Sequence, residues 1–258
     1  MKDYFVYGNS KTFRDYLRVL YQFVDTLQAV MDQEKIEVRQ MDPSRVSMIL
    51  LSMPKHVFDE YYFKGQEPRQ IHLDLDNDLV GKGKTPFRKI YKDERVRFDF
   101  DEETYSVQLL GDLKRSWTLP LLDEEFEVPP IPKIEEIMKA TVILTVDGLM
   151  KVMDDLEDSE GFTITVERDQ VIFSQKTDVK IYNVPLRKGS YALLKVDVEE
   201  EITSNYPVDY VKAFVNAVKP LCSVIKIRLG KDSPIEVQAM VPEDATLKLW
   251  CAPRIETE

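Results

Sequence analysis

LPLLDEEFEVPPIPK, residues 119–133, lies near the middle of the 258-residue chain and decides how the rest is organised. It begins as an apolar strand end, passes through four carboxylates and ends in Pro129, Pro130 and Pro132. Because proline fixes φ and has no backbone N–H, we expect an extended segment outside any sheet. Residues 121–133 are therefore predicted to be a semi-rigid connector between two domains, residues 1–120 and residues 134–258.

The sequences on the two sides of this connector resemble each other. RSWTLPLL (115–122) ends the first half and LKLWCAPRI (247–255) ends the second, and each contains Trp-x-x-Pro. EKIEVRQMD (34–42) likewise parallels RDQVIFSQKTD (168–178). The same order of elements on both sides indicates a duplicated unit.

Hydrophobic periodicity predicts the elements of each half. Helical spacing is found in residues 10–24, 147–156 and 207–218, and a helix beginning at Thr85 and Pro86 is expected within residues 79–92. Strands are expected at residues 3–8, 35–40, 45–52, 61–64, 70–76, 95–101, 105–110, 116–121, 140–144, 162–167, 171–174, 179–184, 191–196, 224–229, 235–240 and 246–252. The predicted fold class is α+β: two similar domains, each with two helices packed on antiparallel sheets, joined by a connector loop.

The composition sets limits on function. The net charge is −11, with 43% hydrophobic and 31% charged residues. No apolar run approaches the roughly 18 residues of a membrane helix, and residues 1–11 lack the apolar core of a signal peptide, so we expect an intracellular protein without a membrane partner. The acidic total argues against nucleic acid, but a locally basic face can coexist with an acidic exterior.

Three motifs carry a resemblance: MDPSRVSMILL (41–51), the acidic-to-proline connector, and LWCAPRIE (249–256). In this order and spacing they resemble the sliding-clamp family, the proliferating cell nuclear antigen (PCNA) group, with an archaeal-type ending. The resemblance implies a non-enzymatic DNA polymerase processivity factor without a cofactor. It implies a ring of three like or sibling subunits that encircles double-stranded DNA independently of sequence. Through a short aromatic-bearing motif it would tether DNA polymerase, the clamp loader, flap nuclease and ligase, in the cytoplasm or nucleoid of an archaeon or in the nucleus of a eukaryote.

A clamp that slides needs diffuse positive charge directed at phosphates and no base-reading groups. The expected helices and the segment after residue 81 carry such residues. The predicted DNA-binding set is Lys11, Arg14, Arg18, Lys82, Lys84, Arg88, Lys89, Lys92, Lys151, Lys212 and Lys219. Lys151 is the only positive residue of its predicted helix among several carboxylates, so we expect weak DNA contact there.

The resemblance also implies two protein-binding surfaces. Partners would insert an aromatic-bearing plug into a groove lined by Met41, Val46, Met48, Val128, Ile131, Pro234, Trp250, Ala252 and Pro253. Neighbouring subunits would pair through the strand edges at residues 109–119 and 177–184. The residues assigned to that interface are Leu109, Leu110, Trp117, Val179 and Ile181.

Two alternatives remain open. One keeps the fold and makes the chain a specialised subunit of a mixed, heterotrimeric ring. The other is a metal-dependent nucleic-acid hydrolase that uses Asp74, Asp76 and Asp78, although their segment lacks the glycine and glutamate of a calcium loop. No nucleophile–base set can be assembled, so neither a catalytic residue nor a metal site is predicted.

Overall fold

A computed structural model describes residues 2–158 and 160–254. It divides into two compact units: the first consists of residues 2–43, 49–129 and 241–246, and the second of residues 44–48, 130–240 and 247–254. Ile255 and Glu256, the end of the C-terminal motif, lie outside the described residues. Within the described ranges, none of the helices has the length and apolar character needed to cross a membrane.

The first unit contains one regular α-helix in its described part, α1 (Ser10–Tyr21). Three short helical turns follow it, η1 (Lys55–Val57), η2 (Leu75–Val80) and η3 (Pro86–Arg88). Its strands are β1 (Asp3–Tyr7), β2 (Thr26–Met31), β3 (Lys35–Met41), β4 (Ser47–Pro54), β5 (Glu60–Tyr62), β6 (Arg69–Asp74), β7 (Arg95–Phe100), β8 (Thr104–Leu110) and β9 (Arg115–Pro120).

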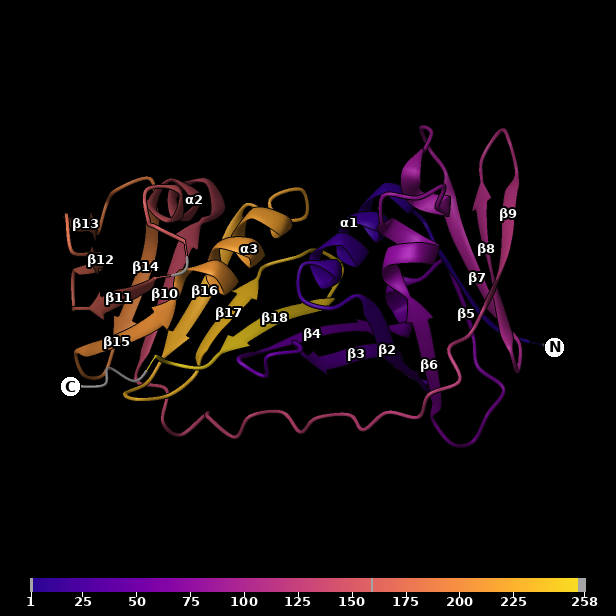
Figure 1. Cartoon of the computed structure of the whole chain (residues 1–258), viewed down its shortest axis with the longest axis horizontal. Helices are drawn as coiled ribbons and strands as arrows, with labels where there is room; N and C mark the ends of the chain where they lie inside the picture. Colours follow the sequence, from indigo (N-terminus) through magenta and orange to yellow (C-terminus); the bar gives the residue numbers. More distant parts are fainter. Residues whose placement is uncertain (1, 159, 255–258) are drawn as a thin grey trace. The chain divides into compact units, whose positions relative to one another are not determined.

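The second unit has two helices, α2 (Val146–Asp154) and α3 (Val208–Val218), which pack against each other over one face of a sheet (Figure 1). Its strands are β10 (Ala140–Thr145), β11 (Gly161–Val166), β12 (Gln170–Lys176), β13 (Ile181–Arg187), β14 (Leu193–Val198), β15 (Ile202–Pro207), β16 (Val224–Leu229), β17 (Ile235–Ala239) and β18 (Thr246–Cys251).

The two units repeat one strand topology. The first unit contains the antiparallel orders β5-β1-β7-β8-β9 and β4-β3-β2-β6, and the second contains β14-β10-β16-β17-β18 and β13-β12-β11-β15. Adding nine to each strand number of the first unit gives the second unit's order in both cases. This agreement in hydrogen-bonded neighbours supports the duplication inferred from the sequence, because unrelated connections would rarely give the same order twice.

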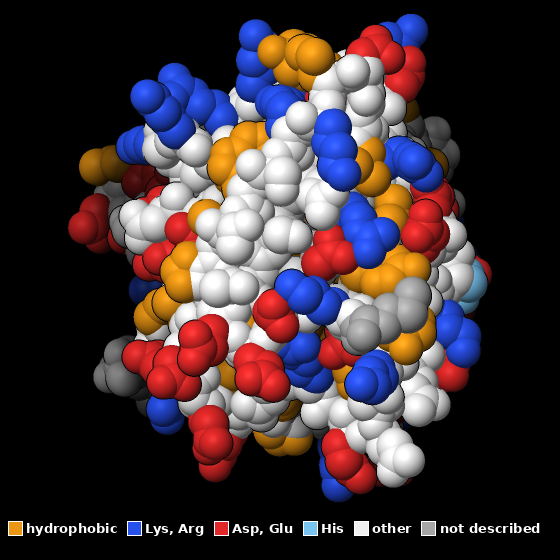
Figure 2. Space-filling view, turned by 90° about the vertical axis from the view of Figure 1, so that its right-hand side faces the viewer, with side chains coloured by type: hydrophobic (Ala, Val, Ile, Leu, Met, Phe, Trp, Pro, Cys, Tyr) orange, Lys and Arg blue, Asp and Glu red, His pale blue; other side chains and the backbone are white. Residues whose placement is uncertain are grey.

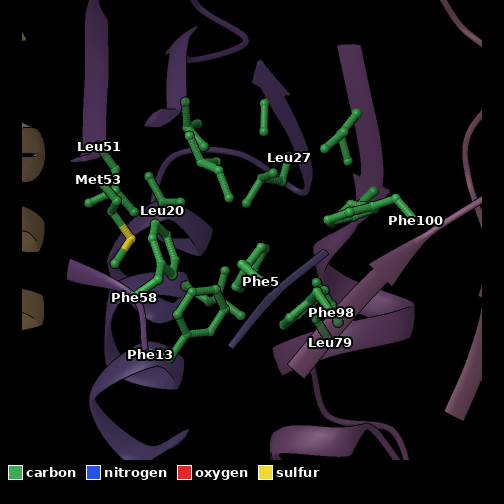
Figure 3. Close-up of a pocket in the computed structure, with 16 residues that line it drawn as sticks. Phe5, Phe13, Leu20, Leu27, Leu51, Met53, Phe58, Leu79, Phe98 and Phe100 are labelled. Carbon is green, nitrogen blue, oxygen red and sulfur yellow. The ribbon is translucent and has the colours of Figure 1, made fainter. Parts of the chain in front are cut away.

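The core of the first unit is largely aromatic (Figure 3). The ring centroid of Phe98 lies 5.0 Å from that of Phe5 and 5.4 Å from that of Phe13, and all three side chains are buried. They surround an apolar cavity of about 50 Å³ between α1 and the strands. Helical spacing places Phe13 on the apolar face of α1, so one stripe of the helix fastens it to the sheet and leaves the opposite stripe in solvent.

The helix expected within residues 79–92 is wrong. The structure has the π-helical turn η2 before this segment and only the three-residue turn η3 inside it. The Asp74 carboxylate accepts the backbone N–H of Asn77 at 2.8 Å and so begins η2 early. Gly81 and Gly83 then interrupt the helix, and Lys89 has extended backbone angles that end η3. The first unit thus has one helix where two were expected.

Candidate functional site

The basic stripe of α1 exists, and its members differ in how much of their charge is free. Asn9, one residue before the expected cap, begins the helix by accepting the N–H of Thr12 at 3.0 Å. Lys11 and Arg18 are exposed. Burial lowers the pKa of Arg18, and the nearby positive charge of Arg14 lowers it further. A phosphate placed there would relieve this like-charge repulsion.

Arg14, in contrast, already forms an ion pair within the protein. Its Nε and Nη2 atoms lie 3.0 and 2.9 Å from Oδ1 of Asp15, whose side chain is buried. The paired charges nearly cancel at the distance of a phosphate. Of the predicted DNA-contacting residues on α1, Lys11 and Arg18 are therefore the ones with free positive charge.

The predicted basic residues after residue 81 lie on irregular backbone rather than on a helical stripe. Lys82, Lys84, Arg88, Lys89 and Lys92 are all exposed. A loop can still contact phosphates, because phosphate contacts need charge and not a fixed register. Figure 2 shows one face on which Lys and Arg side chains are most numerous in the upper half, while several acidic side chains gather at the lower left. The acidic total of the chain therefore does not prevent local basic clusters.

The predicted contacts of the second unit are mostly balanced by carboxylates. Lys212 Nζ lies 2.8 Å from Asp158 and Lys219 Nζ lies 3.5 Å from Asp147. Lys151 donates to the hydroxyl of Tyr191 at 3.2 Å and lies over its ring. These cations carry less free charge than Lys11 and Arg18, and weak DNA contact near α2 stays a prediction.

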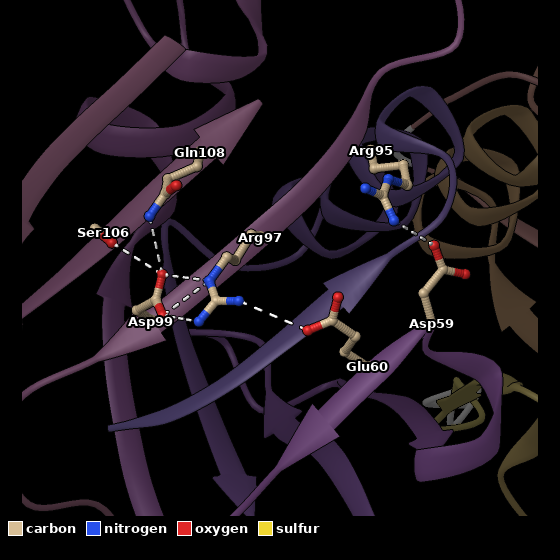
Figure 4. Close-up of polar contacts among 7 residues, drawn as sticks. All are labelled: Asp59, Glu60, Arg95, Arg97, Asp99, Ser106 and Gln108. Atoms are coloured by element: carbon tan, nitrogen blue, oxygen red, sulfur yellow. Dashed lines mark hydrogen bonds and ion pairs between the residues drawn. The ribbon is translucent and has the colours of Figure 1, made fainter. Parts of the chain in front are cut away.

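Cations on the strands of the first unit are likewise used within the protein (Figure 4). Arg97 donates from Nε to both oxygens of Asp99 at 2.9 Å and lies 3.8 Å from Glu60. Arg95 lies 3.6 Å from Asp59. The Arg97–Glu60 pair joins β7 to β5 on either side of β1, and charges paired in this way leave little field for a ligand. In the described part of the first unit, free positive charge is thus concentrated on α1 and the loop from residue 82 to residue 92.

The carboxylates that suggested a hydrolase have structural roles, so that alternative is wrong. Asp74 caps η2, and Asp76 accepts a hydrogen bond from the hydroxyl of Tyr21. Burial raises the pKa of Asp78. Among the described residues, no group of three or more His, Cys, Asp or Glu side chains is arranged to hold a metal ion. These acids therefore form the end of a strand and a helical turn rather than a metal centre.

The first half of the connector is fastened to the edge strand β6. The Leu122 N–H donates to the His72 carbonyl at 2.9 Å, and the Gln70 side-chain amide donates to the Phe126 carbonyl at 3.0 Å. His72 Nδ1 lies 3.3 Å from the Glu124 carbonyl and its Nε2 lies 3.1 Å from Oγ1 of Thr26. Since a carbonyl only accepts, Nδ1 carries the proton and Nε2 accepts from the threonine.

Phe126 is a residue that the sequence analysis missed. Its ring meets the buried His72 ring edge-on, with centroids 5.8 Å apart. Both residues line a cleft of about 720 Å³ that also contains the carboxylates of residues 123–125. An aromatic residue between acidic neighbours in a connector was the available signal, because such a side chain needs a surface to pack on.

The segment just after the connector is held by a charge network. Glu135 accepts from both terminal nitrogens of Arg228, at 3.1 and 2.5 Å, and this bond lowers the pKa of Glu135. Arg228 also lies 3.4 Å from the buried Glu236. Glu236 in turn accepts from Nε1 of Trp250 at 3.1 Å. A chain of polar contacts thus links the connector's end to the indole.

The residues predicted to line the partner groove divide into two kinds. Met41, Val46, Val128, Pro234, Ala252 and Pro253 are half-buried, and Ile131 is 47% exposed. Met48 and Trp250 are only 4% and 3% exposed, so neither side chain is available to a partner in this structure. Their placement in the groove lining needs correction, because both faces of the strands are buried at these points: residues 47–51 of β4 and residues 249–251 of β18 are all buried. Of the nine residues, Ile131 is the one that the structure leaves clearly exposed.

The two predicted interface edges are edge strands of their sheets. In the described residues β9 pairs only with β8, and β13 pairs only with β12. Val179 and Ile181 are 88% and 70% exposed. Trp117 and Leu110 are half-buried, whereas Leu109 is fully buried inside the unit and cannot contact a neighbour directly. The assignment of Leu109 to the interface is therefore wrong, because β8 is an inner strand.

No protein-family model matches the chain. Among curated proteins, "DNA polymerase sliding clamp 1" of Thermococcus kodakarensis is 26% identical over 255 residues, which cover 97% of this chain and 98% of that protein. The "DNA polymerase sliding clamp" of Nanoarchaeum equitans is 26% identical over 253 residues, covering 96% of this chain and 98% of its own length.

Solved structures give the same picture of the fold. The PCNA of Thermococcus kodakaraensis has a TM-score of 0.84 at 21% identity and covers 98% of this chain and 100% of its own. The proliferating cellular nuclear antigen of Entamoeba histolytica has a TM-score of 0.86 at 19% identity and covers 99% of this chain and 100% of its own. A chain of a PCNA2–PCNA3 complex of Sulfolobus tokodaii has a TM-score of 0.83 at 20% identity and covers 98% of this chain and 100% of its own. The resemblance inferred from the three sequence motifs is thereby confirmed: this chain has the fold of the PCNA sliding clamps, and its curated relatives over nearly its whole length are DNA polymerase sliding clamps.

Proposed function

We propose that this chain is a DNA polymerase processivity factor, one subunit of a ring of three that encircles duplex DNA and tethers replication and repair enzymes. The observation that carries the proposal is the repeated strand topology, which each unit completes with an unpaired edge, together with whole-length similarity to sliding clamps. Two different free edges on one chain suit a head-to-tail ring, because a heterologous contact closes when its rotation closes.

The electrostatics support the same role. Lys11, Arg18 and the basic loop from residue 82 to residue 92 offer charge to phosphates, while the strand cations are neutralised by neighbours. Such a surface holds DNA through counterion release and reads no bases, so it permits sliding. This role places the protein with the replicating DNA of its cell, in the nucleoid of an archaeon or the nucleus of a eukaryote.

The partner enzymes would bind at the connector. Its second half, residues 127–133, forms no hydrogen bond or ion pair within the part of the chain that the structure describes, while Phe126 before it and Glu135 after it are both held. Extended proline-rich backbone with exposed Ile131 suits a short aromatic-bearing motif that docks on preformed structure. Polymerase, clamp loader, flap nuclease and ligase are the partners we assign to it.

The test is polymerase extension on primed circular single-stranded DNA, with the clamp loader, at a salt concentration that suppresses unassisted synthesis. We expect longer products with the chain present, and loss of the effect when the primed template is linear and a ring can slide off. Stimulation that is equal on linear and circular templates would contradict encirclement.

A mixed ring is the second candidate, and the structural similarity to a complex of two different PCNA chains favours it. Measuring the mass of the purified chain, alone and together with sibling subunits, distinguishes a homotrimer from a mixed ring. A stable three-subunit mass from this chain alone supports a homotrimer, and a single-subunit mass that rises only with siblings supports the mixed ring.

A further inference from the structure

The cavity in the core of the first unit, about 50 Å³ between α1 and the strands, has an entirely apolar wall (Figure 3). The sixteen described residues that line it are all aliphatic, aromatic or methionine. All of them are buried except Ile36, which is half-buried. Every wall residue belongs to the first unit, so the cavity is a property of this unit alone.

Aromatic rings and paired strands keep this space open. The Phe5 ring centroid lies 4.9 Å from that of Phe58 and 5.0 Å from that of Phe98, so these rings already rest on one another. Ala29 and Val38 are direct partners in the β2–β3 ladder and are the smallest side chains of the wall. Because both strands are fixed by their neighbours in the sheet, the backbone cannot move inward to fill the gap.

Water does not suit this cavity. A buried water molecule typically forms about three hydrogen bonds, and the surface of this wall is wholly apolar. Cavities of this kind stay dry, and the atoms that line them lose the dispersion contacts that a filled core would give. A guest that restores these contacts and needs no hydrogen bond is therefore favoured.

The volume of the cavity limits the size of this guest. A water molecule needs roughly 10–15 Å³ of such space, and a cavity of about 150 Å³ accepts benzene. At about 50 Å³ this cavity is too small for a benzene ring and large enough for one compact molecule. We propose that it is a binding site for a single small apolar molecule, of the size of a xenon atom or of a hydrocarbon with about one to three carbon atoms.

The guest enters past Ile36, the wall residue that is half-buried. Ile36 follows the turn between β2 and β3, and Tyr61 holds this turn: its hydroxyl lies 2.6 Å from the Asp32 carbonyl oxygen and 2.7 Å from that of Lys35. The Tyr61 ring also packs against Phe58 of the wall, with centroids 5.4 Å apart. Tyr61 thus controls how fast the cavity exchanges its guest and leaves the space inside unchanged.

Xenon is the probe that tests the site. The readout is the methyl correlation spectrum of the full chain, labelled at its isoleucine and leucine methyl groups, under rising xenon pressure. We expect saturable shifts at wall residues such as Leu20, Ile71 and Leu79, and none at Ile164 and Ile225, which are buried in the second unit. Equal shifts in both units would reflect only the general solubility of xenon in protein cores and would overturn the site. Magnetisation transfer from water to the wall methyl groups would also overturn it, because the cavity would then be wet.

A cavity-filling variant tests the position of the site. Ala29→Val adds two methyl groups to the wall and should abolish the saturable shifts. Ala239→Val is the matched control, because Ala239 is a buried strand residue of the second unit that does not line the cavity, and it should keep the xenon affinity of the parent chain. Val38→Ile adds one methyl group from the partner strand and should weaken xenon binding several-fold, which keeps the test decisive if Ala29→Val does not fold. Parent-like xenon affinity in a folded filling variant would overturn the proposal.

Tyr61→Phe tests the route. The variant keeps the ring and removes the hydroxyl that holds the turn, so xenon should exchange several-fold faster, as methyl line widths report, with unchanged affinity. An unchanged exchange rate would overturn entry past Ile36. None of these outcomes requires DNA or assembly, so failure of the site and failure of the proposed function are separate results.

Discussion

The basic residues of α1 differ in whether their charge is free, and this difference predicts which substitutions weaken DNA binding and which lower the stability of the fold. Lys11 and Arg18 carry free charge, whereas Arg14 is bonded to the buried Asp15. We expect Arg18→Gln to weaken binding to a short duplex and to leave the melting temperature unchanged. Arg14→Gln should instead lower the free energy of unfolding by about 1–3 kcal/mol, because a buried carboxylate loses its partner, and should change DNA binding less.

Counterion release sets the size of the binding effect. Each lost phosphate contact lowers the slope of log K against log salt by about 0.9, so between 50 and 200 mM salt one contact accounts for roughly a 3- to 4-fold change in affinity. Arg18→Gln should therefore bind more weakly at 50 mM, and its deficit should shrink by roughly that factor at 200 mM. The double variant with Lys11→Gln should lose about twice as much slope.

The assay is fluorescence anisotropy of a labelled duplex titrated at several salt concentrations, with thermal unfolding measured on the same samples. Lys231→Gln is the matched control, since Lys231 is an exposed lysine on the turn between β16 and β17 and its loss changes the net charge equally. An equal loss of slope in the control would show that only total charge matters. An unchanged slope in Arg18→Gln would refute the role of the stripe.

Three further predictions concern the fold and the connector. Burial raises the pKa of Tyr206 to about 12, so its contribution to stability is full below the unfolded value near 10 and falls as pH rises from 10 through 12, by up to roughly 3 kcal/mol. Tyr7, Tyr61 and Tyr105, whose pKa values burial also raises, add to the loss over the same range. In chemical denaturation at pH 8 and 11.5, Tyr206→Phe should therefore lose roughly 2 kcal/mol less than the parent chain. His72→Phe keeps an aromatic contact for Phe126 but loses the N–H that donates to the connector, so limited proteolysis should cut residues 121–127 several-fold faster. His72→Asn keeps a donor and should restore part of the protection. Equal cutting of the parent chain and both variants would show that His72 does not hold the connector. The bond from Arg228 lowers the pKa of Glu135, so it adds stability that is present above about pH 4.5 and is lost as pH falls below that value. Glu135→Gln should remove this small dependence of the free energy of unfolding on pH. An acid-unfolding curve with the same pH dependence in the variant as in the parent chain would contradict the prediction.

The sequence predicted the parts of the fold that local patterns determine. The apolar stripe of α1 and the extended connector follow from spacing and proline content, whereas the two edge strands were assigned from the family resemblance. β2 and β15 were missed for different reasons. β2 (TLQAVM) follows α1 without a glycine or proline to mark the change, and β15 (ITSNYP) buries Ser204 as well as Ile202 and Tyr206, so its inward face does not look apolar. The duplication offered a remedy, since the counterpart of each missed strand was predicted.

The candidate site was less predictable because tertiary packing decides which charges and apolar groups are free. Nothing local distinguishes Arg14, which is held by Asp15, from Arg18, which is not. Trp250 looks like a groove residue in sequence, but Glu236, fourteen positions earlier, accepts its N–H and both side chains are buried. Such outcomes depend on pairings between distant segments that periodicity does not reveal.

Pro120 ends the edge strand β9 and Pro185 lies within the edge strand β13, and both matter for the chain on its own. A newly made chain carries two uncovered strand borders, and uncovered borders invite uncontrolled sheet growth into aggregates. Pro120 and Pro185 leave each border too short to template a long foreign strand. These two prolines thus protect the solitary chain at two strand edges that it leaves unpaired.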